Sequence, residues 1–218
     1  MIGCCGHHRE RPPGKGESEM TQPQLRLRSY RLSDAQKIVT WCTDERGFYQ
    51  WSAGILGQYP LTAERFNQTM AARDESAAYF PFVAEGEEGP AGFFILRCPG
   101  EEAGVLRFCF VILDPALRGR CYGKAMLRLG LGYAFDLYGA KKVTLGVFEN
   151  NPRACHCYNS LGFREAESTS TYEIGGEAWH CLYSLNPALR VPRAVPTLPP
   201  ESRYAFMERW REVSSGSS

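Results

Sequence analysis

Residues 114–125 join a short apolar run to a long periodic one, and this junction limits the possible folds more than any other segment. The run before it, residues 108–113, is almost entirely aromatic or aliphatic, which is typical of a buried strand. The run after it, residues 122–138, has apolar side chains at helical spacing. Since Pro115 cannot continue a strand ladder and Gly119 lets the backbone turn, the sequence predicts a strand, a tight turn and a helix in succession.

Three cations surround the start of that helix: Arg118, Arg120 and Lys124. Positive charge at a helix N-terminus opposes the helix dipole and costs roughly 0.3–1 kcal/mol per residue. A bound anion removes the conflict, because first-turn N–H groups and a loop of small residues offer hydrogen-bond donors to a phosphate. The spacing matches neither the nucleoside-triphosphate loop nor the dinucleotide glycine pattern. The sequence therefore predicts a phosphate-bearing ligand of another kind, and the alternative is that the three cations simply face solvent.

Charge and cysteine content narrow the range of partners. The 218 residues carry 25 Lys and Arg against 24 Asp and Glu, a net charge of +1, which argues against nucleic acid as an obligate partner. The nine cysteines are odd in number and form no Cys-x-x-Cys pair, so we expect reduced thiols in a cytoplasmic protein, without disulfides or a metal. Thiols and imidazoles at residues 4–8 lack the second half of a zinc site. No apolar run reaches membrane length, so no membrane segment is expected.

Composition divides the chain into three parts. Residues 1–23 are rich in Gly, Pro, Arg and Glu without periodicity and are expected to form a disordered leader, with Met20 as an alternative start. Residues 24–186 have the apolar content of one globular domain. Residues 187–218 begin with a proline-rich linker and continue with a narrow apolar face at helical spacing. This C-terminal helix is expected to dock on the domain, with a partner-binding helix as the alternative.

Within residues 24–186, strand-like and helix-like periods predict an α/β domain, an α+β mixture with seven strands. The strands are expected at residues 25–30, 79–85, 92–97, 105–113, 142–148, 169–174 and 178–185. The helices are expected from Ser33 to about residue 46, from Thr62 to about residue 73, over residues 122–138 and after Asn151. Residues 47–60 are expected to form a loop or broken helix with many large apolar side chains.

A second motif follows the fifth predicted strand. Asn151 and Pro152 open a short helix as cap and first-turn residue, Tyr158 lies within it, and residues 161–163 end it. Together with residues 115–125, this motif resembles the GNAT superfamily of acetyl-CoA-dependent N-acetyltransferases. The resemblance implies a GNAT-like fold, with a central mixed, mostly antiparallel twisted sheet of about seven strands and flanking helices. The helix pair at the start and the hairpin at the end look most like the ribosomal-protein and peptide N-terminal acetyltransferases.

The resemblance implies acetyl-CoA as the acyl donor and gives particular residues a role. The backbone of Phe110, Val111 and Ile112 would pair with the pantetheine arm, like an added strand. Asn151 would reach the pantetheine region, and Tyr158 would protonate the departing thiolate. The pyrophosphate would be held by main-chain N–H groups and cationic side chains of Arg118, Gly119, Arg120, Cys121, Tyr122, Gly123 and Lys124.

One position departs from the family pattern, since Cys121 stands where Arg-x-x-Gly-x-Gly places its first glycine. The Cβ and sulfur of Cys121 are expected to crowd the pyrophosphate, while a residue with ordinary helical dihedrals would still donate its N–H. The sequence therefore predicts coenzyme binding that is weakened and not abolished.

Each candidate residue also has a purely structural explanation. Tyr158 fits a core tyrosine, and Asn151 fits a plain helix cap. Amine attack benefits from a general base, but the sequence does not assign one. The fifth predicted strand has Gly146 where some relatives place a glutamate, and Glu149 at its end is the nearest carboxylate.

The expected reaction is acetyl transfer from acetyl-CoA to a primary amine by direct attack in a ternary complex. The acceptor is expected to be a peptide or a small molecule. The protein is expected to be a monomer or a homodimer. Phe48, Tyr49, Trp51 and Tyr59 form the expected acceptor wall, with core packing as the alternative. Two other functions fit the same residues: a catalytically silent acyl-CoA-binding or scaffold module, and an acyltransferase for a longer acyl-CoA.

Overall fold

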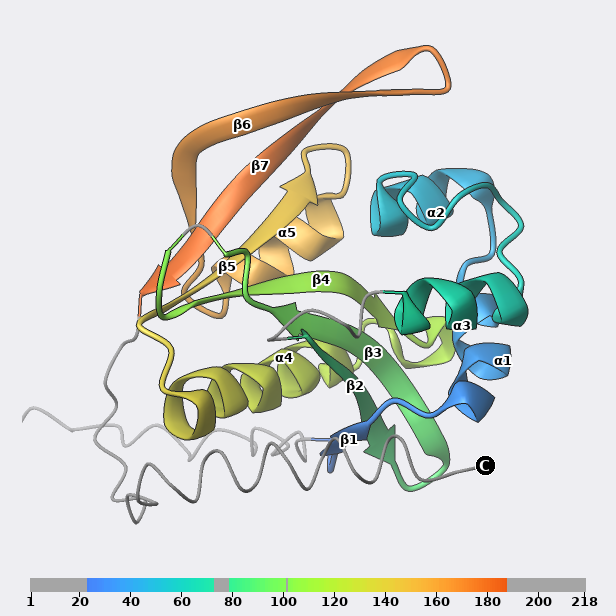
Figure 1. The fold of residues 1–218 in the computed structure, drawn as a ribbon, viewed down its shortest axis with the longest axis horizontal. Helices are drawn as coiled ribbons and strands as arrows, with labels where there is room; N and C mark the ends of the chain where they lie inside the picture. Colours follow the sequence, from blue (N-terminus) through green and yellow to red (C-terminus); the bar gives the residue numbers. More distant parts are fainter. Residues whose placement is uncertain (1–22, 73–78, 101, 188–218) are drawn as a thin grey trace, which may run out of the picture.

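The computed structural model describes residues 23–72, 79–100 and 102–187, which form one seven-stranded sheet with helices on both faces (Figure 1). The strand order is β1-β2-β3-β4-β5-β7-β6. The strands are β1 (Arg26–Ser29), β2 (Tyr79–Gly86), β3 (Gly89–Arg97), β4 (Val105–Leu113), β5 (Lys142–Phe148), β6 (Arg164–Ile174) and β7 (Glu177–Pro187). Neighbouring strands are antiparallel except β4 and β5, which are parallel. The predicted mixed, mostly antiparallel sheet is confirmed.

The helices divide between the two faces of the sheet. In chain order they are η1 (Leu32–Asp34), α1 (Ala35–Ile38), η2 (Val39–Trp41), α2 (Glu45–Ser52), α3 (Ala63–Ala71), η3 (Pro115–Leu117), α4 (Tyr122–Gly132), η4 (Tyr133–Tyr138) and α5 (Pro152–Asn159). Helices α4 and α5 pack on one face, and α1 to α3 pack on the other. The turn η4 continues α4 with π-helical bonding, and Gly139 ends it with a φ of +80°.

Alternating side chains of β3 separate two hydrophobic cores. Phe94 and Leu96 face the core beneath α4, whereas Phe93 and Ile95 face the core beneath α1 to α3. All four side chains are fully buried, because helices cover the central strands on both sides. The sheet therefore carries an α4 core on one face and an α1–α3 core on the other.

Helix α4 approaches the sheet closely at Gly130. A Cβ added to this glycine would lie 2.7 Å from the ring of Phe108 and 2.9 Å from the ring of Phe94. Only a residue without a side chain fits this contact without displacing the two rings. The glycine thus holds α4, and the turn that precedes it, against β3 and β4.

The predicted helix from Ser33 to about residue 46 is wrong. The segment divides into η1, α1 and η2, and the chain is extended at Cys42 before α2 begins. The carboxylate of Asp44 accepts a hydrogen bond from the N–H of Gly47 at 2.7 Å and so caps α2. This local bond competes with continuation of the preceding helix. As a result, α2 occupies the first part of the predicted loop.

The other predicted elements are present with shifted ends. Thr62 caps α3 as expected, accepting a hydrogen bond from a first-turn N–H at 3.2 Å. The closing hairpin is longer than predicted, because β6 begins at Arg164 and β7 reaches Pro187. The predicted leader, residues 1–23, and the predicted tail, residues 187–218, lie almost entirely outside the described residues.

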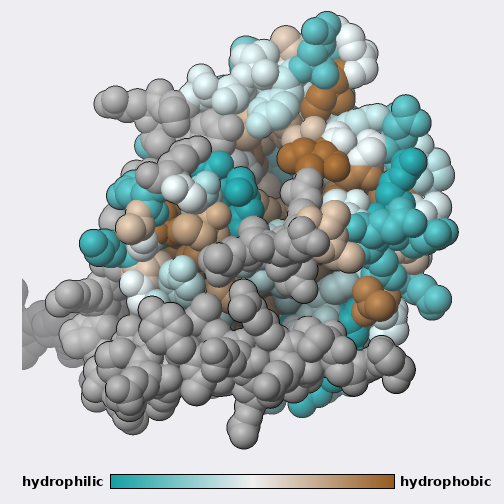
Figure 2. Space-filling view, viewed as in Figure 1, coloured by the Kyte–Doolittle hydropathy of each residue, from teal (hydrophilic) through white to brown (hydrophobic). Residues whose placement is uncertain are grey.

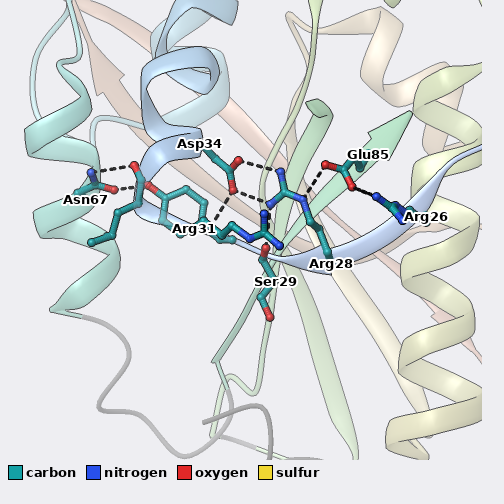
Figure 3. A network of polar contacts seen from close by, with 9 residues as sticks. Arg26, Arg28, Ser29, Arg31, Asp34, Asn67 and Glu85 are labelled. Atoms are coloured by element: carbon teal, nitrogen blue, oxygen red, sulfur yellow. Dashed lines mark hydrogen bonds and ion pairs between the residues drawn. The ribbon is translucent and has the colours of Figure 1, made fainter. Parts of the chain in front are cut away.

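An ion network ties β1 to β2 and to the first helical turn (Figure 3). Arg28 makes a bidentate pair with Asp34 at 2.7 and 2.8 Å and donates to Glu85 at 3.1 Å. Asp34 also accepts the N–H of Arg31 at 2.8 Å, and Glu85 also accepts from Arg26 at 2.6 Å. The hydrogen bonds from Arg26 and Arg28 lower the pKa of the Glu85 carboxyl. Its stabilising contribution is therefore present at neutral pH and is lost as the pH falls through the lowered pKa.

We expect Asp34→Ala to lower the free energy of unfolding by about 3 kcal/mol, because a largely buried guanidinium loses its bidentate partner. The side chain of Arg28 is only 15% exposed. Glu102→Ala is the control, since Glu102 pairs with Lys142 but is 62% exposed, and loss of such a pair costs under about 1 kcal/mol. Urea denaturation of both variants measures the difference. Equal losses in the two variants would contradict this account of the network.

Candidate active site

The candidate site lies where β4 and β5 part. Their parallel ladder ends at the pair Phe108 and Leu145. Beyond this pair, residues 109–113 of β4 and 146–148 of β5 continue as strands that diverge from each other (Figure 1). Strand β4 still pairs with β3 on its other edge, and β5 still pairs with β7. The two facing edges can therefore hold an extended ligand through main-chain hydrogen bonds, as an added strand would.

A β-bulge in β4 begins directly after the ladder ends. Strand β3 pairs Ile95 with Cys109 but Phe93 with Ile112, so β4 has one extra residue across this step. Phe110 adopts a φ of +49°, a conformation that is rare for a bulky residue and stores strain of order 1–3 kcal/mol. The bulge turns both Cys109 and Phe110 toward the α1–α3 core.

The three residues predicted to contact pantetheine lie on this bulge. The side chains of Phe110 and Ile112 are buried in the α1–α3 core, and Val111 packs against the α4 core. Their side chains are thus committed to packing on the two faces of the sheet. A contact with pantetheine through their main chain, as the resemblance implies, is compatible with this arrangement and stays a prediction.

The turn between β4 and α4 is shaped by Asp114 and Arg118. The carboxylate of Asp114 accepts the N–H of Ala116 at 3.0 Å. Arg118 Nη2 donates to the carbonyl oxygens of Trp41 at 3.1 Å and Leu113 at 3.3 Å. Arg118 therefore ties the end of β4 to η2, a structural role that the sequence did not predict. A phosphate bound by its side chain would share the guanidinium with these two carbonyls.

Cys121 adopts a left-handed backbone conformation, with φ of 63° and ψ of 0°, at the N-cap of α4. The expectation of ordinary dihedrals at this residue is wrong. The turn passes through the left-handed region twice, at Gly119 with φ of +75° and again at Cys121. At the second position the Cβ costs roughly 1–2 kcal/mol that a glycine would not. The side chain of Cys121 is exposed.

The other two predicted cations also lie near the start of α4. The guanidinium of Arg120 lies 5.7 Å from the ring centroid of Tyr122. Burial raises the pKa of the Cys157 thiol, and the positive charge of Lys124 opposes this shift. The first N–H groups of a helix have no acceptor within it. Donors and cations predicted to hold an anion are therefore brought together at this turn.

Helix α5 lies against the same turn. A Cβ added to Gly123 would lie 4.0 Å from Sγ of Cys157, so the first turn of α4 and the α5 helix are neighbours. Asn151 Oδ1 accepts the N–H of Ala154 at 3.3 Å and caps α5, as its structural explanation requires. Its predicted contact with pantetheine stays a prediction. The fold thus places the two sequence motifs side by side.

Tyr158 lies in the α4 core, which also contains Val147 from the diverging part of β5. Its ring centroid is 6.0 Å from that of Phe163, and the residue is 8% exposed. Burial raises the pKa of its phenol well above the ordinary value, so the hydroxyl remains protonated at neutral pH. Within the part of the chain that the structure describes, this hydroxyl makes no hydrogen bond.

On the α1–α3 side, α2 reaches across to the β6–β7 hairpin and to the loop after β5. Gln50 Nε2 donates to the carbonyl oxygen of Asn150 at 2.8 Å. Arg46 lies 5.0 Å from the ring centroid of Trp179 and 3.4 Å from the carboxylate of Glu177. Figure 2 shows hydrophobic surface where the hairpin faces α2. Helix and hairpin therefore border the α1–α3 side of the place where β4 and β5 part.

Some of the four aromatic residues predicted to form the acceptor wall are instead packed in the core. Phe48 is fully buried in the α1–α3 core, where Tyr59 also packs against it. Trp51 is half-buried, with its ring centroid 6.4 Å from that of Phe110 at the bulge. Tyr49 packs against a separate aromatic group around Trp179, in the half of the hairpin near its turn.

Sequence reasoning missed Gln50, Phe148 and Trp179 at this border. The alternating pattern of the closing hairpin places Trp179 on one face and was available as a signal. The ring of Phe148 packs against that of Trp179 at 5.3 Å, a contact between strands that no local pattern indicates. Nothing in the sequence shows that Gln50 meets a residue 100 positions away.

Two properties concern the whole of the described chain. None of its helices combines the length and the apolar content that crossing a bilayer requires. No three His, Cys, Asp or Glu side chains in residues 23–72, 79–100 and 102–187 are grouped so as to hold a metal ion.

Sequence comparison decides the family. Residues 36–163, more than half of the chain, match the family model described as the acetyltransferase (GNAT) family. This chain belongs to the GNAT acetyltransferase family. Both the β4–α4 turn and the cap of α5 lie within the matched residues, so the resemblance seen in the two motifs is confirmed.

Relatives within the GNAT family match only part of the chain. Mycothiol acetyltransferase from Corynebacterium glutamicum (strain R) is 39% identical over 93 residues, which are 42% of this chain and 30% of the relative. Spermidine N(1)-acetyltransferase from Escherichia coli (strain K12) is 27% identical over 96 residues, which are 38% of this chain and 52% of the relative. The chain thus spans 30% to 52% of the length of these two curated relatives.

Solved structures agree on the GNAT fold. Spermidine N-acetyltransferase from Vibrio cholerae, solved in complex with CoA and spermine, has a TM-score of 0.64 at 20% sequence identity. The match covers 75% of this chain and 95% of that chain. At this identity the likeness shows the fold alone.

The left-handed backbone at Cys121 generates a prediction with two opposite variants. Cys121→Gly removes the Cβ, so we expect equal or higher stability and tighter binding of acetyl-CoA. Cys121→Val places a branched side chain in the same conformation and is expected to lower the free energy of unfolding by about 1–2 kcal/mol and to weaken binding. Thermal denaturation and calorimetric titration with acetyl-CoA measure both effects.

The control for this series is Cys155→Gly, inside helix α5, where a glycine is expected to lower stability by about 1 kcal/mol. Opposite signs at the two cysteines would isolate the effect of the backbone conformation. Acetyl-CoA affinity that is unchanged or lower in Cys121→Gly would overturn the account of crowding at the pyrophosphate.

Proposed function

We propose that this chain transfers the acetyl group of acetyl-CoA to a primary amine, on a peptide or a small molecule, by direct attack in a ternary complex. The observation that carries the proposal is the parting of β4 from β5 after Phe108 and Leu145, directly beside the bulge at Phe110. The first turn of α4 lies against α5 and against the end of β4, since a Cβ added to Gly123 would be 4.0 Å from Sγ of Cys157 and 4.0 Å from the side chain of Leu113. Membership of the GNAT family supports the same reaction class.

The residues at the site fit the parts of an acyl-CoA. Main-chain N–H groups at the start of α4, with Arg120 and Lys124 beside them, suit the diphosphate. The bulged edge of β4 suits the pantetheine amides, because an extended chain with amide groups pairs with a strand edge. The side chain of Asn151 already caps α5, so only its remaining amide hydrogens are available to the pantetheine.

The thioester supplies the acetyl group, and each residue of the site has a defined task in its transfer. The main chain of residues 110–112 orients the carbonyl. The amine nitrogen forms the new bond to the carbonyl carbon as the bond from carbon to sulfur breaks. The hydroxyl of Tyr158 donates its proton to the leaving sulfur, for which its raised pKa keeps it protonated.

The nitrogen must arrive neutral, whereas primary amines with a pKa of about 8–10 are mostly protonated at neutral pH. Glu149 follows β5 directly, and its N–H donates to the carbonyl oxygen of His180 at 3.0 Å. Its side chain is exposed and makes no hydrogen bond within the described residues. We assign no general base to this chain. The proton that the amine loses passes to solvent, so every proton of the reaction is accounted for.

The relatives do not identify one particular acceptor, because one is called a mycothiol acetyltransferase and another a spermidine N(1)-acetyltransferase. We therefore propose only that the acceptor is an amine. The likeness to peptide N-terminal acetyltransferases favours a peptide amine. Seven free cysteines in the described part of the chain support the expected cytoplasmic location, where thiols stay reduced.

The first test combines binding with turnover. We expect calorimetry to detect acetyl-CoA binding, and we expect at least one amine in a panel of peptides, polyamines and simple primary amines to release free CoA. Binding of acetyl-CoA without turnover of any amine would favour the silent binding module. Faster turnover with octanoyl-CoA than with acetyl-CoA would favour the longer-chain acyltransferase.

The second test concerns Tyr158. We expect Tyr158→Phe to lower kcat about 100-fold, because the leaving sulfur loses its proton donor, and to leave the acetyl-CoA affinity within about twofold. Tyr133→Phe is the matched control, since Tyr133 is also a tyrosine of the α4 side, with a pKa that burial raises to about 12. Its ring packs on Phe82 at 4.7 Å. Similar kcat values for the two variants would show that Tyr158 is only a core residue.

A further inference from the structure

The continuous helix formed by α4 and η4 carries partly exposed apolar residues along one side. Leu129 is 37% exposed and Leu137 is 43% exposed, and they are two of the four large apolar side chains that are exposed in the described part of the chain. Tyr133 lies one turn from each of them and is half-buried. Leu129, Tyr133 and Leu137 form one row, which we call the α4–η4 stripe.

The π-helical bonding of η4 brings the two leucines into line. In a regular α-helix, residues eight positions apart differ by about 80° in direction around the helix axis. Because η4 is π-helical, each of its residues turns the chain by less than an α-helical residue does. The difference in direction between Leu129 and Leu137 is therefore smaller than in a regular α-helix.

Aromatic side chains widen the stripe toward the edge of the sheet. The ring centroid of Phe80 on β2 lies 5.7 Å from that of Tyr133 and 5.8 Å from that of Tyr138. Phe80 and Tyr138 are half-buried, and the exposed residues Arg128 and Asp136 border the stripe. Single exposed leucines are common on protein surfaces, whereas apolar side chains joined in this way with a polar rim indicate a binding surface.

The described part of the chain ends close to this stripe. Pro187 is the register partner of Lys142, which lies three residues after Gly139 at the end of η4. Residues 188–200 are rich in proline and can span up to roughly 40 Å when extended. Helices α4 and η4 together are roughly 25 Å long. A segment that begins at residue 201 can therefore reach the whole stripe.

The segment of residues 201–213, which lies outside the described residues, has an apolar row of matching length. Phe206, Trp210 and Val213 are at helical spacing. In a helix this row is roughly 10 Å long, and the distance along the helix from Leu129 to Leu137 is roughly 12 Å. Large aromatic side chains such as those of Phe206 and Trp210 are typical anchors of an interface.

The size of the stripe favours a segment of the same chain over a separate partner. A stable interface between separate proteins buries about 800 Å² on each partner and involves about 20–30 residues on each side. The α4–η4 stripe and the rings beside it are much smaller than this. A tethered segment has an effective concentration in the millimolar range, so that a small apolar contact is sufficient to hold it.

We propose that residues 201–213 form a helix whose apolar face docks on the α4–η4 stripe. The docked helix covers the outer side of the same helix whose first turn carries the donors predicted to hold a phosphate, and it stabilises that helix against local unfolding. This inference concerns the packing of the chain and does not depend on the proposed acetyl transfer.

Photo-crosslinking in the full chain tests which segment occupies the stripe. On irradiation, Leu137→p-benzoylphenylalanine is expected to form crosslinks to residues 201–213 of the same chain, identified by mass spectrometry of the digested monomer. Ile55→p-benzoylphenylalanine is the matched control, because Ile55 is 51% exposed but follows α2 on the other face of the sheet. It is expected to give no crosslink to residues 201–213. Crosslinks from position 137 to a second chain, or none to residues 201–213, would overturn the proposal.

Hydrogen exchange of the full chain tests whether the docked helix stabilises α4 and η4. Trp210→Ala is expected to raise the amide exchange rates of residues 129–138 at least about fivefold and to leave those of α2 unchanged. Tyr204→Ala is the matched control, since Tyr204 lies on the opposite side of the predicted helix from Phe206, and it is expected to change neither set of rates.

A double variant connects the two surfaces. Leu137→Ala is expected to raise the same exchange rates as Trp210→Ala does, and the two changes together are expected to give no more than the larger single effect, because both remove one contact. Effects that multiply in the double variant would overturn the proposal, as would equal effects of Tyr204→Ala and Trp210→Ala.

Discussion

The interruption of the parallel ladder between β4 and β5 is the constraint on which the candidate site depends. Up to Phe108 and Leu145 the two strands satisfy each other's backbone groups, and a ladder continued to their ends would leave no edge for a ligand. The extra residue of the bulge prevents continuation by changing the direction of β4. A main-chain edge is thereby placed near two helix termini, in the interior of a sheet whose neighbouring strands are otherwise paired.

The two cores keep the strands apart. On one face Phe110 and Ile112 are anchored beneath α1 to α3, and on the other Val147 and Tyr158 are anchored beneath α4 and α5. Packing on both faces compensates for local strain. Two of the three non-glycine residues with positive φ in the described chain, Phe110 and Cys121, lie at the site, the third being Ala53. Such strain persists only where the surroundings hold the backbone in place.

Local chemistry accounts for the predictions that succeeded. Thr62 and Asn151 cap the helices that the sequence assigned to them, and Gly139 ends the helix after β4, because each of these effects depends on residues within one turn. The predictions that failed concern positions where two local preferences of the backbone compete. At Asp44 a side-chain cap prevailed over continuation of a helix, and at Cys121 the turn imposed a glycine-like conformation on a residue with a side chain.

The sequence by itself determined the succession of strands and helices, the GNAT motifs and the cluster of donors and cations before α4, since periodicity, capping and turn chemistry act over a few residues. Only the tertiary structure decided where the β4–β5 ladder stops, that Arg118 binds the carbonyls of Trp41 and Leu113, and that Arg97 stands opposite Arg107. These features depend on strand register and on the packing of distant segments. Register is set by the burial of whole faces of the sheet, so no single segment contains it.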